Sequence, residues 1–375
     1  MNSRQQICVL PGDGVGIEVT EAVLPIFEAL RLPIDLKFGQ IGWDCWRKYG
    51  DPVPAQTWEI ISSCDATLLG AVTSKPLREA EEELRFSLRG SRLSYVSPVI
   101  QLRQKLELFA NVRPITDILG DKRYQFTVIR ENTEGLYAGL DFDSIPAEFE
   151  PVLARHEQNG AVWKRQGSKD ASMSVRLQTS AGLTRLFRFA FDYAQRQGFK
   201  RVTLADKPNV LRHSGAFARD LLETVAADFP DISAQIENVD AVALWMVRRP
   251  ERFGVIVAEN MFGDILSDLG AGVMGGLGLA PSANIGAQGA YFEPVHGSAP
   301  KYTGQNRVNP CAMFLTVALL LEHLGHHSSA DAVRRAVTHV ARSESRTSDL
   351  NGTASTSEMA SAIVSQTVAH AERLL

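Results

Sequence analysis

Short apolar runs and segments of helical periodicity alternate through the first hundred residues. The apolar runs are rich in β-branched residues and predict strands at Ile7–Leu10, Ile34–Phe38 and Ala66–Leu69. The segments between them predict helices near Ile17–Leu30 and at Ala55–Ser62. Because strand and helix alternate, we expect an α/β fold with a largely parallel sheet.

The same pattern continues to the end of the chain. Further strands are predicted at Phe126–Ile129, Arg201–Ala205, Ile232–Glu237 and Gly254–Ala258. One helix, ending near Gly198, is indicated by apolar residues at helical spacing: Leu183, Leu186, Phe187, Ala190, Tyr193 and Ala194. The tail predicts three more helices, at Pro310–Leu324, Ala330–Arg342 and Ser355–Leu374.

Two segments lack a core pattern of their own. Thr73–Ser97 is charged and poorly periodic, and we expect it to form a mobile loop over a cleft. Phe149–Ser174 is polar and compatible with strands. We expect this second segment to be an arm that packs on a partner subunit.

Composition narrows the class of protein. The 375 residues allow two domains or one two-lobed unit, and a formal net charge of −4 predicts no general affinity for nucleic acid or a membrane surface. The longest apolar run, Met313 to Leu321, is too short to span a bilayer, and the first residues carry no signal-peptide pattern. The four cysteines lack Cys-x-x-Cys spacing, so we expect reduced thiols and a cytoplasmic protein; they are Cys8, Cys45, Cys64 and Cys311.

Two carboxylates stand four residues apart in Glu259-Asn-Met-Phe-Gly-Asp-Ile-Leu-Ser-Asp268, which follows a predicted strand. On a helix, Asp264 and Asp268 would lie one turn apart on the same face. Two oxygen ligands in this arrangement can hold Mg²⁺ or Mn²⁺ and leave coordination positions free for a substrate. The alternative is an acidic, solvated first turn that the helix dipole favours.

Three arginines stand next to core-like residues. Arg103 lies in Leu-Arg-Gln-Lys-Leu, Arg113 directly precedes a proline, and Arg130 ends an apolar run. Guanidinium groups form paired, charge-assisted hydrogen bonds with carboxylates, so three that converge would bind a di- or tricarboxylic acid. For each arginine alone, a structural salt bridge is the alternative.

Tyr137 and Lys207 are candidates for proton transfer. Lys207 follows the predicted strand at Arg201–Ala205, and the carboxyl ends of strands are where α/β proteins usually have their sites. Asp240 is a candidate third metal carboxylate, or else a helix N-cap.

Glycine-rich segments occur twice. Pro11-Gly-Asp-Gly-Val-Gly-Ile-Glu18 lacks the Gly-x-Gly-x-x-Gly spacing of a dinucleotide fingerprint, and a tight turn explains its glycines equally well. In the segment from Glu293 to Pro310, small residues would let the backbone approach a pyrophosphate. There, His296 could contact an adenine, and Lys301 and Tyr302 could contact an extra ribose phosphate.

Together these motifs resemble the β-decarboxylating dehydrogenases, the family of isocitrate, homoisocitrate and 3-isopropylmalate dehydrogenases. The likeness runs from Leu10-Pro-Gly-Asp-Gly-Val-Gly-Ile-Glu18 to Thr347-Ser-Asp-Leu-Asn-Gly352. The segments Asn260–Asp268 and His296-Gly-Ser-Ala-Pro300 are highly specific to that family.

The resemblance implies a homodimer of two-lobed α/β subunits with a nucleotide site that is not a Rossmann fold. The large nucleotide-binding lobe would comprise residues 1–108 and 275–375. The small lobe, residues 109–274, would carry the dimer interface and the arm at about 149–174. The active site would lie in the cleft between the lobes.

The resemblance also implies roles for individual residues. Arg103, Arg113 and Arg130 would clamp the malate part of a small carboxylic acid, and Ser97 would bond a further carboxylate. Asp264 and Asp268 of one subunit and Asp240 of its partner would bind Mg²⁺ or Mn²⁺. Lys207, contributed across the interface, would remove the substrate's hydroxyl proton together with Asp240, and Tyr137 would protonate the enol formed by loss of CO₂. The nicotinamide cofactor would contact Thr73, Ser74, His296, Gly297, Ser298, Ala299, Lys301, Tyr302 and Asn309.

Two departures from the family pattern bear on cofactor and substrate. Where NAD-dependent relatives have aspartate, this chain has Lys301, which favours NADP, with NAD as the alternative. Arg130-Glu-Asn-Thr-Glu-Gly135 resembles the isocitrate and homoisocitrate branches, but Val96 and Val99 make the wall around Ser97 apolar. We therefore rank isocitrate first, homoisocitrate or another extended malate second and 3-isopropylmalate third. An inactive regulatory subunit is a remote alternative.

One position has no explanation from the sequence. Gly254 stands where aspartate is common in the family.

Overall fold

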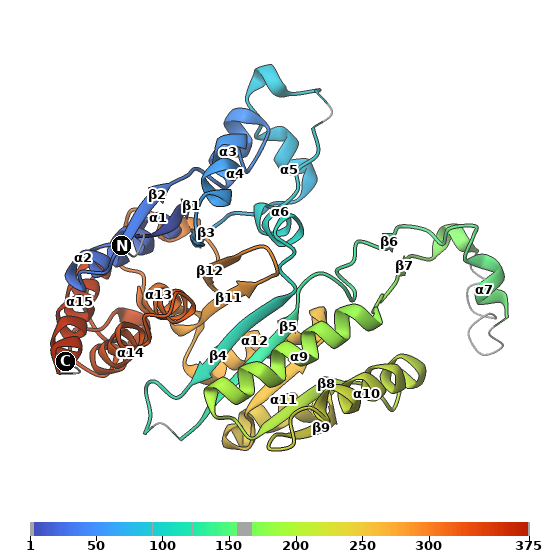
Figure 1. Ribbon diagram of the computed structural model, residues 1–375. Helices are drawn as coiled ribbons and strands as arrows, with labels where there is room; N and C mark the ends of the chain where they lie inside the picture. The colour runs from blue at the N-terminus through green and yellow to red at the C-terminus, as the bar shows by residue number, and fades with distance from the viewer. Residues whose placement is uncertain (1–3, 92, 122, 156–166, 374–375) are drawn as a thin grey trace.

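The computed structural model describes residues 4–91, 93–121, 123–155 and 167–373. One mixed sheet of ten strands runs through the molecule in the order β2-β1-β3-β12-β11-β4-β5-β10-β8-β9 (Figure 1). Its strands are β1 (Gln5–Gly12), β2 (Ile34–Phe38), β3 (Ala66–Ala71), β4 (Ala110–Thr116), β5 (Gln125–Glu131), β8 (Arg201–Asp206), β9 (Ser233–Asn238), β10 (Val255–Ala258), β11 (Pro281–Ile285) and β12 (Ala290–Pro294). A separate two-stranded ribbon pairs β6 (Asp141–Phe142) with β7 (Met173–Ser174).

The predicted parallel sheet is confirmed at both ends and interrupted in the middle. Strands β2, β1, β3 and β12 pair in parallel, and so do β5, β10, β8 and β9. Between them, β11 is antiparallel to both β12 and β4, and β4 is antiparallel to β5. The sequence analysis did not predict β4, β11 and β12, because it relied on continuous apolar runs and these strands contain polar residues or proline.

The helices are α1 (Val15–Val23), α2 (Pro25–Ala29), α3 (Trp43–Tyr49), α4 (Ala55–Ser62), α5 (Leu77–Glu82), α6 (Pro98–Lys105), α7 (Glu150–Ala154), α9 (Ser180–Gln197), α10 (Arg212–Ala226), α11 (Val239–Arg248), α12 (Asn260–Met274), α13 (Cys311–His323), α14 (His327–Ala341) and α15 (Thr356–Glu372). Helix α12 packs on β4 and β5, and α13 packs on β11 and β12. No helix in the described part of the chain has both the length and the apolar character needed to cross a bilayer.

Two predicted helices have different bounds in the structure. The helix expected over Ile17–Leu30 is two helices, α1 and α2, because Pro25 begins the second and has no N–H with which to continue the first. The tail helix expected from Ala330 begins at His327.

The expectation of a loop throughout Thr73–Ser97 is wrong. The segment contains α5, and its side chains Ala80, Leu84 and Tyr95 are buried against Trp43 and Trp46 of α3. Periodicity within the segment could not reveal this, because the aromatic partners come from α3.

Only part of the proposed arm, Phe149–Ser174, can be described. It begins with the short helix α7 and ends in β7, which pairs with β6. Residues 156–166 lie outside the described residues.

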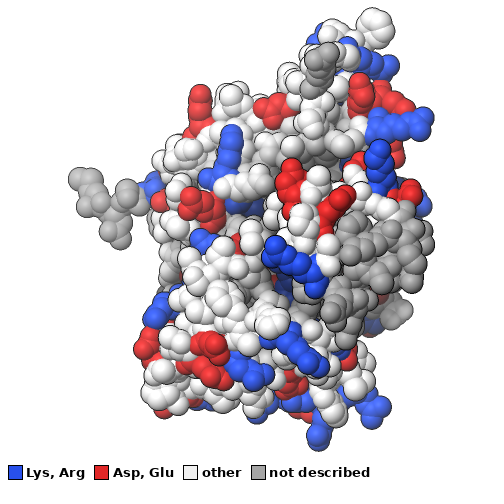
Figure 2. All heavy atoms as spheres, turned by 90° about the vertical axis from the view of Figure 1, so that its right-hand side faces the viewer, with Lys and Arg blue, Asp and Glu red and all other residues white. Residues whose placement is uncertain are grey.

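On the face of the molecule in Figure 2, basic and acidic side chains are interspersed over the described part of the surface.

Candidate active site

Strand register brings Arg113 and Arg130 to one face of the sheet. Asn111 of β4 pairs with Arg130 of β5, and side chains two residues apart on a strand point to the same face, so Asn111, Arg113 and Arg130 share it. Arg130 and Arg113 are largely buried, with side chains 3% and 10% exposed. We call this face of the sheet the front face.

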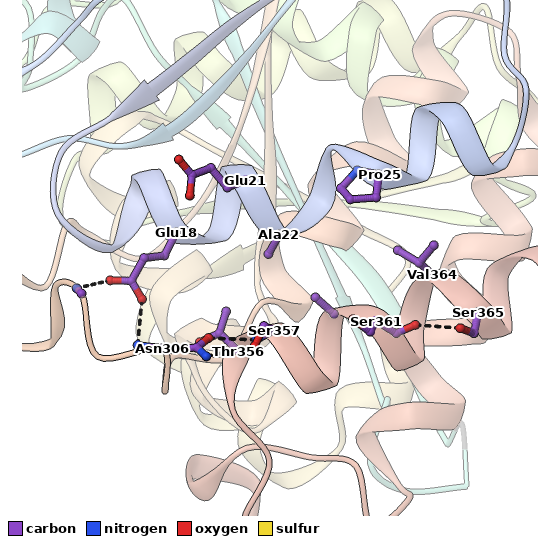
Figure 3. A pocket seen from close by; sticks show the side chains of 12 residues that line it. Glu18, Glu21, Ala22, Pro25, Asn306, Thr356, Ser357, Ser361, Val364 and Ser365 are labelled. Atoms are coloured by element: carbon purple, nitrogen blue, oxygen red, sulfur yellow. Dashed lines mark hydrogen bonds between the residues drawn. The ribbon is translucent and has the colours of Figure 1, made fainter.

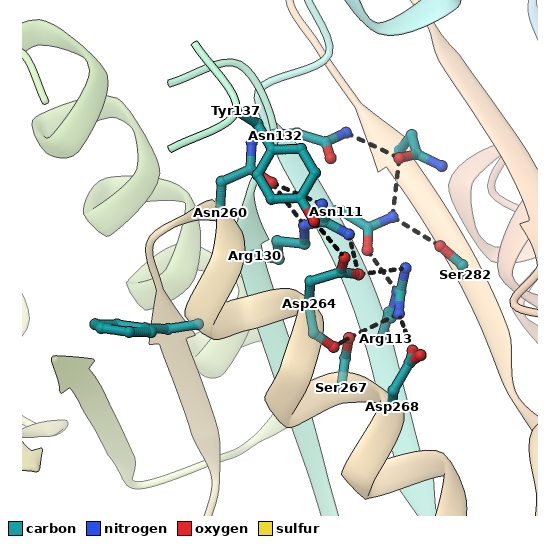
Figure 4. A network of polar contacts seen from close by, with 12 residues as sticks. Asn111, Arg113, Arg130, Asn132, Tyr137, Asn260, Asp264, Ser267, Asp268 and Ser282 are labelled. Carbon is teal, nitrogen blue, oxygen red and sulfur yellow. Dashed lines mark hydrogen bonds and ion pairs between the residues drawn. The ribbon is translucent and has the colours of Figure 1, made fainter. Parts of the chain in front are cut away.

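Helix α12 supplies the acidic partners of these arginines. It begins after Glu259, whose side chain accepts a hydrogen bond from the Phe262 N–H at 3.0 Å. Asp264 forms an ion pair with Arg130, and Arg113 lies 3.6 Å from Asp264 and 2.8 Å from Asp268 (Figure 4). The two predicted metal carboxylates therefore meet two of the predicted substrate arginines.

Each arginine of the cluster has an acidic partner, since Arg103 also lies 3.9 Å from Glu293, but the guanidinium groups still influence one another. Burial, followed by the neighbouring Arg103, lowers the pKa of Arg130 to about 10, although Asp264 acts in the opposite direction. Repulsion between neighbouring guanidinium groups lowers the pKa of a buried arginine. A multiply charged anion bound between such groups would stabilise their charged forms.

Arg103 joins this cluster through a buried polar network on the front face. Arg113 Nε donates to Asn111 Oδ1 at 2.7 Å, and Asn111 Nδ2 donates to Asn284 Oδ1 at 2.8 Å. Asn284 Nδ2 in turn donates to Glu293 Oε1 at 3.1 Å.

Tyr291 completes the connection. Its hydroxyl donates to Glu293 Oε1 at 3.1 Å, and Arg103 Nε donates to the Tyr291 oxygen at 3.4 Å. The network thus links Arg113 of β4 to Arg103 of α6 through strands β11 and β12. Such a fully bonded network fixes the directions of both guanidinium groups.

Tyr137 lies over the same cluster. Its hydroxyl donates to Asp264 Oδ2 at 3.0 Å, and the Arg130 guanidinium lies 5.1 Å from the centre of its ring. Burial, followed by the charge of Asp264, raises the pKa of Tyr137 above its ordinary value. The phenol therefore keeps its proton at neutral pH and can act as an acid.

Lys207 and Asp240 form an ion pair of their own. The Lys207 hydrogen bond lowers the pKa of Asp240, which is exposed on α11. Among the described residues, no hydrogen bond or ion pair connects this pair to Asp264 or Arg130 of the same chain. Within the described residues of one chain, the Lys207–Asp240 pair is therefore not bonded to the cluster of Tyr137, Asp264 and Arg130.

Asp264 and Asp268 fit a divalent cation by their chemistry. Both are oxygen ligands on one helical face, with side chains 32% and 59% exposed, so they are accessible from the front. Within the described residues of one chain, no three His, Cys, Asp or Glu side chains gather closely enough to hold an ion. A third carboxylate from a second copy of the chain would complete such a site.

A pocket of about 600 Å³ contains most of the predicted nucleotide residues. His296, Gly297, Ala299, Tyr302 and Asn309 line it, together with Val15, Leu277, Gly278, Arg307, Val308, Ser348 and Asp349. Lys301 belongs to the same turn, Pro300–Tyr302, but does not line the pocket. Arg307, which sequence reasoning missed, lies 5.7 Å from the Tyr302 ring and does line it.

Burial lowers the pKa of His296, so its ring is neutral at neutral pH and suited to contact with a base. Ser298 connects this pocket to the end of β3, because its hydroxyl lies 2.6 Å from that of Thr73. The hydroxyl oxygen of Ser74 likewise lies 3.1 Å from that of Ser97. The predicted residues Thr73, Ser74, Ser97 and Ser298 thus line a path from the pocket toward α6.

The N-terminal glycine-rich turn approaches the pocket closely. Gly14 has a φ of 57°, and a Cβ added there would lie 2.2 Å from the Ser298 carbonyl oxygen. Val15 N–H donates to that oxygen at 2.9 Å. The turn therefore requires glycine for backbone contact, as the tight-turn interpretation of the motif anticipates.

Glu18 of α1 holds the loop at residues 304–306 in place (Figure 3). Its carboxylate accepts hydrogen bonds from the backbone N–H groups of Gly304 and Asn306, the latter at 3.2 Å. Asn306 Nδ2 also donates to Ser357 of α15 at 2.9 Å. A hollow of about 690 Å³ lies between α1 and α15. Glu18, Gly304 and Asn306 line one end of it, so the same hydrogen bonds shape that end.

Sequence reasoning missed the network behind the arginines, although one signal was available. Asn111 precedes Arg113 by two residues, and period two places both on one face once a strand is assumed there. Asn284 and Ser282 had no such signal, because nothing local indicates that β11 pairs with β4.

The chain matches the family model described as isocitrate/isopropylmalate dehydrogenase over residues 6–363. The chain is 56% identical to Protein DlpA of Legionella pneumophila. The alignment covers 96% of this chain but only 58% of DlpA. The chain is 38% identical to the 3-isopropylmalate dehydrogenase of Methanothermobacter thermautotrophicus and 38% identical to the isocitrate/homoisocitrate dehydrogenase of Thermus thermophilus. Each of these two alignments covers 96% of this chain and 97% of the relative.

A crystal structure of isocitrate dehydrogenase from Methylococcus capsulatus is similar throughout. Its TM-score is 0.81 with 35% sequence identity, over 97% of this chain and 99% of that one.

Proposed function

Because the chain belongs to the isocitrate/isopropylmalate dehydrogenase family, whose members are oxidoreductases that act on CH–OH groups, we propose that it oxidises and decarboxylates a 2-hydroxy-3-carboxy acid. The products would be a 2-oxo acid, CO₂ and a reduced nicotinamide cofactor. The observation that carries the proposal is the contact between the arginine cluster and the Asp264–Asp268 pair, which suits a multiply charged acid held beside a divalent cation.

The chain's own residues have distinct roles in this proposal. Arg103, Arg113 and Arg130 bind the carboxylates, and Asp264 and Asp268 would hold Mg²⁺ or Mn²⁺. When bound, the metal and the nicotinamide would supply polarisation of the substrate oxygens and a hydride acceptor. Lys207, paired with Asp240, would take the hydroxyl proton, and Tyr137 would protonate the carbon that loses CO₂.

Replacing Tyr137 tests the acid directly. Tyr137→Phe keeps the ring over Arg130 but removes the proton, so kcat should fall about 10²–10⁴-fold while KM changes little. Steady-state kinetics with the best substrate measures both constants. If kcat falls less than about threefold, Tyr137 is not the acid.

We propose that the active unit is a homodimer with shared sites and that the chain divides into the lobes 1–108 with 275–375, and 109–274. The strand order supports the division, because the strands of the first part, β2, β1, β3, β12 and β11, are neighbours in the sheet, and those of the second part, β4, β5, β10, β8 and β9, follow them. The exposure of Asp240 on α11 supports a shared site, since an exposed carboxylate is accessible to a second copy of the chain.

For the cofactor we propose NADP, with NAD as the alternative. Lys301 and Tyr302 suggested this choice, and Arg307 at the wall of the pocket supports it, since a guanidinium can pair with a 2′-phosphate. Asp349 lines the same pocket and favours NAD by its charge. The ratio of kcat/KM for the two cofactors decides, and a ratio in favour of NAD would reject the choice.

For the substrate we propose the isocitrate type, meaning (2R,3S)-isocitrate or homoisocitrate, with 3-isopropylmalate as the alternative. The relatives named above include all three activities. Turnover of the three acids with Mg²⁺ or Mn²⁺ tests the ranking, and removal of metal by EDTA should abolish turnover. If no acid supports cofactor reduction by the purified chain, the alternative of an inactive regulatory subunit is favoured instead.

A further inference from the structure

A second pocket, of about 700 Å³, lies on the opposite side of the central strands from the arginine cluster. Its floor consists of Val112 of β4, Ala283 and Ile285 of β11, and Phe292 of β12. Its walls come from α9 on one side and from α13 and α14 on the other. We call it the rear pocket.

Strand alternation explains why the two sites lie back to back. Asn111, Asn284 and Tyr291 pair across three strands and belong to the front network. Their neighbours Val112, Ala283 and Phe292 pair in the same way, one residue along, and point to the rear. The rear floor is thus apolar because the polar positions of these strands face the front.

The polar rim of the rear pocket contains both paired and unpaired groups. Arg334 is paired with Glu322 and, at 3.1 Å, with Asp331. Gln197 Nε2 also donates to Glu322, at 2.6 Å. These groups satisfy one another and leave little charge for a ligand.

The unpaired groups at the rim are all basic. Within the described residues, Arg196 of α9 makes no ion pair or side-chain hydrogen bond, nor do His323 and His327. Arg196 and His323 line the same pocket, and burial, followed by the Arg196 charge, lowers the pKa of His323. His323 also lies against Phe292, with ring centres 5.4 Å apart and the ring planes tilted by 54°.

An apolar floor with a few convergent polar groups is the usual composition of a small-molecule site, and the volume lies in the usual range. Among the described residues of the rim, Arg196 carries the unpaired charge, so it selects an anion, and its single guanidinium matches one carboxylate. We infer that the rear pocket binds a small organic monocarboxylate with an apolar body, whose carboxylate meets Arg196 and whose body lies on Val112, Ala283 and Phe292. This site is separate from the proposed reaction and does not depend on it.

The test uses the full-length protein and three probes: 3-phenylpropanoate, its neutral amide and acetate. The ring proton signals of His323 and His327 are followed by NMR during titration, with His323→Asn used to assign the spectrum. These histidines line the rear pocket, so carboxylates bound at the front arginines do not produce the same signal. We expect saturable shifts with 3-phenylpropanoate, and affinity about tenfold lower for the amide and for acetate.

Arg196→Glu should weaken 3-phenylpropanoate binding by at least about tenfold. Arg335→Glu, an equal change of charge on the exposed side of α14 outside the pocket, should change it less than about twofold. Arg196 is exposed, so the variant should fold; if it does not, Arg196→Gln carries the same expectation. Equal binding of acid and amide, equal binding by wild type and the Arg196 variant, or no saturable shift at millimolar probe would each overturn the proposal.

Discussion

Asn111 is the residue on which the geometry of the front site most depends. It is fully buried, accepts from Arg113 Nε and donates to Ser282 and Asn284 at 2.7 and 2.8 Å. A buried amide with all of these partners holds the guanidinium in one direction. Arg113 also contacts both carboxylates of α12, so its direction sets where a substrate carboxylate can bind.

We predict that Asn111→Ala raises KM for the acid substrate about tenfold and lowers the free energy of unfolding by about 1–3 kcal/mol, because several buried polar groups lose a partner. Asn132→Ala is the matched control, since Asn132 also donates to Asn284, at 2.9 Å, but forms no hydrogen bond with an arginine among the described residues. The control should lose stability with KM nearly unchanged. Denaturant unfolding and initial-rate kinetics measure the two effects, and equal KM values in both variants would contradict a positioning role.

At the scale of single elements, the α5 segment depends on one carboxylate. Glu83 pairs with Lys75 and accepts from Trp43 Nε1 at 2.7 Å, which ties the segment to α3. The Lys75 hydrogen bond, followed by that of Trp43, lowers the pKa of Glu83. A lowered carboxyl pKa stabilises the folded state above the unfolded pKa of about 4.3, and this contribution is lost as pH falls through the lower folded value.

We therefore predict that Glu83→Gln speeds backbone hydrogen exchange across residues 73–97 at neutral pH. In the wild type, exchange in this segment, corrected for intrinsic rates, should rise when pH falls below about 4, and the variant should lack this acid dependence. Glu82→Gln is the control, because Glu82 is exposed and, among the described residues, forms an ion pair with Arg78 of the same helix alone. Identical acid dependence in wild type and Glu83→Gln would show that another group ties down the segment.

The start of β10 explains Gly254. A Cβ at this position would lie 2.7 Å from the Arg201 carbonyl oxygen and 3.1 Å from Phe199 Cβ. The neighbouring backbone therefore leaves no room for a larger residue at position 254, and this steric reason does not involve the charge of an aspartate.

We predict that Gly254→Ala lowers the free energy of unfolding by about 1–3 kcal/mol, because the neighbouring strand must shift. Gly272→Ala on α12 is the opposite control: no atom lies within 4 Å of its added Cβ, so the helix should gain about 0.5–1 kcal/mol. Thermal or denaturant unfolding compares the two, and a neutral Gly254→Ala would reject the steric explanation.

At the scale of the whole molecule, an exposed apolar surface extends over α11 and α12. Leu244 and Val247 are 56% and 59% exposed, and they lie four and seven residues after Asp240, on the same helical face. Ile265, beside Asp264 on α12, is 58% exposed. A second copy of the chain that covered this surface would meet Asp240 directly, which is what a shared site requires.

We predict that Leu244→Arg dissociates the proposed homodimer and abolishes activity, because the partner would no longer supply Lys207 and Asp240. Phe38→Arg is the control: Phe38 is 55% exposed on β2, at the edge of the sheet, and its replacement should change neither property. Sedimentation and activity are measured at the same concentration. Full activity from a monomeric Leu244→Arg would contradict a shared site.

Local patterns were sufficient where one segment forms one element. The helix from Ser180 to Gln197 was predictable because its apolar stripe and the terminal Gly198 are both local. The fully apolar strands, such as β10, were equally clear. The motif at Asn260–Asp268 identified its own helix and two carboxylates, and the family resemblance it carries is confirmed.

Long-range pairing decided the rest. Strand β4 was missed because its polar residues face a buried network that only the pairing with β11 provides. Arg307 lines the pocket proposed for the cofactor, and Lys301 does not, because of the shape of a turn that composition does not specify. The rear pocket depends on the same strands and on helices distant in sequence.

The sequence by itself determined which side chains this protein can use: arginines, paired aspartates, a tyrosine and a lysine, each recognisable beside its own strand or helix. Only the tertiary structure decided which of them meet, since strand order and register bring residues from β4, β5, β11 and β12 into one row. The physical reason is that chemistry resides in single residues, whereas distance between residues depends on contacts that no local segment encodes.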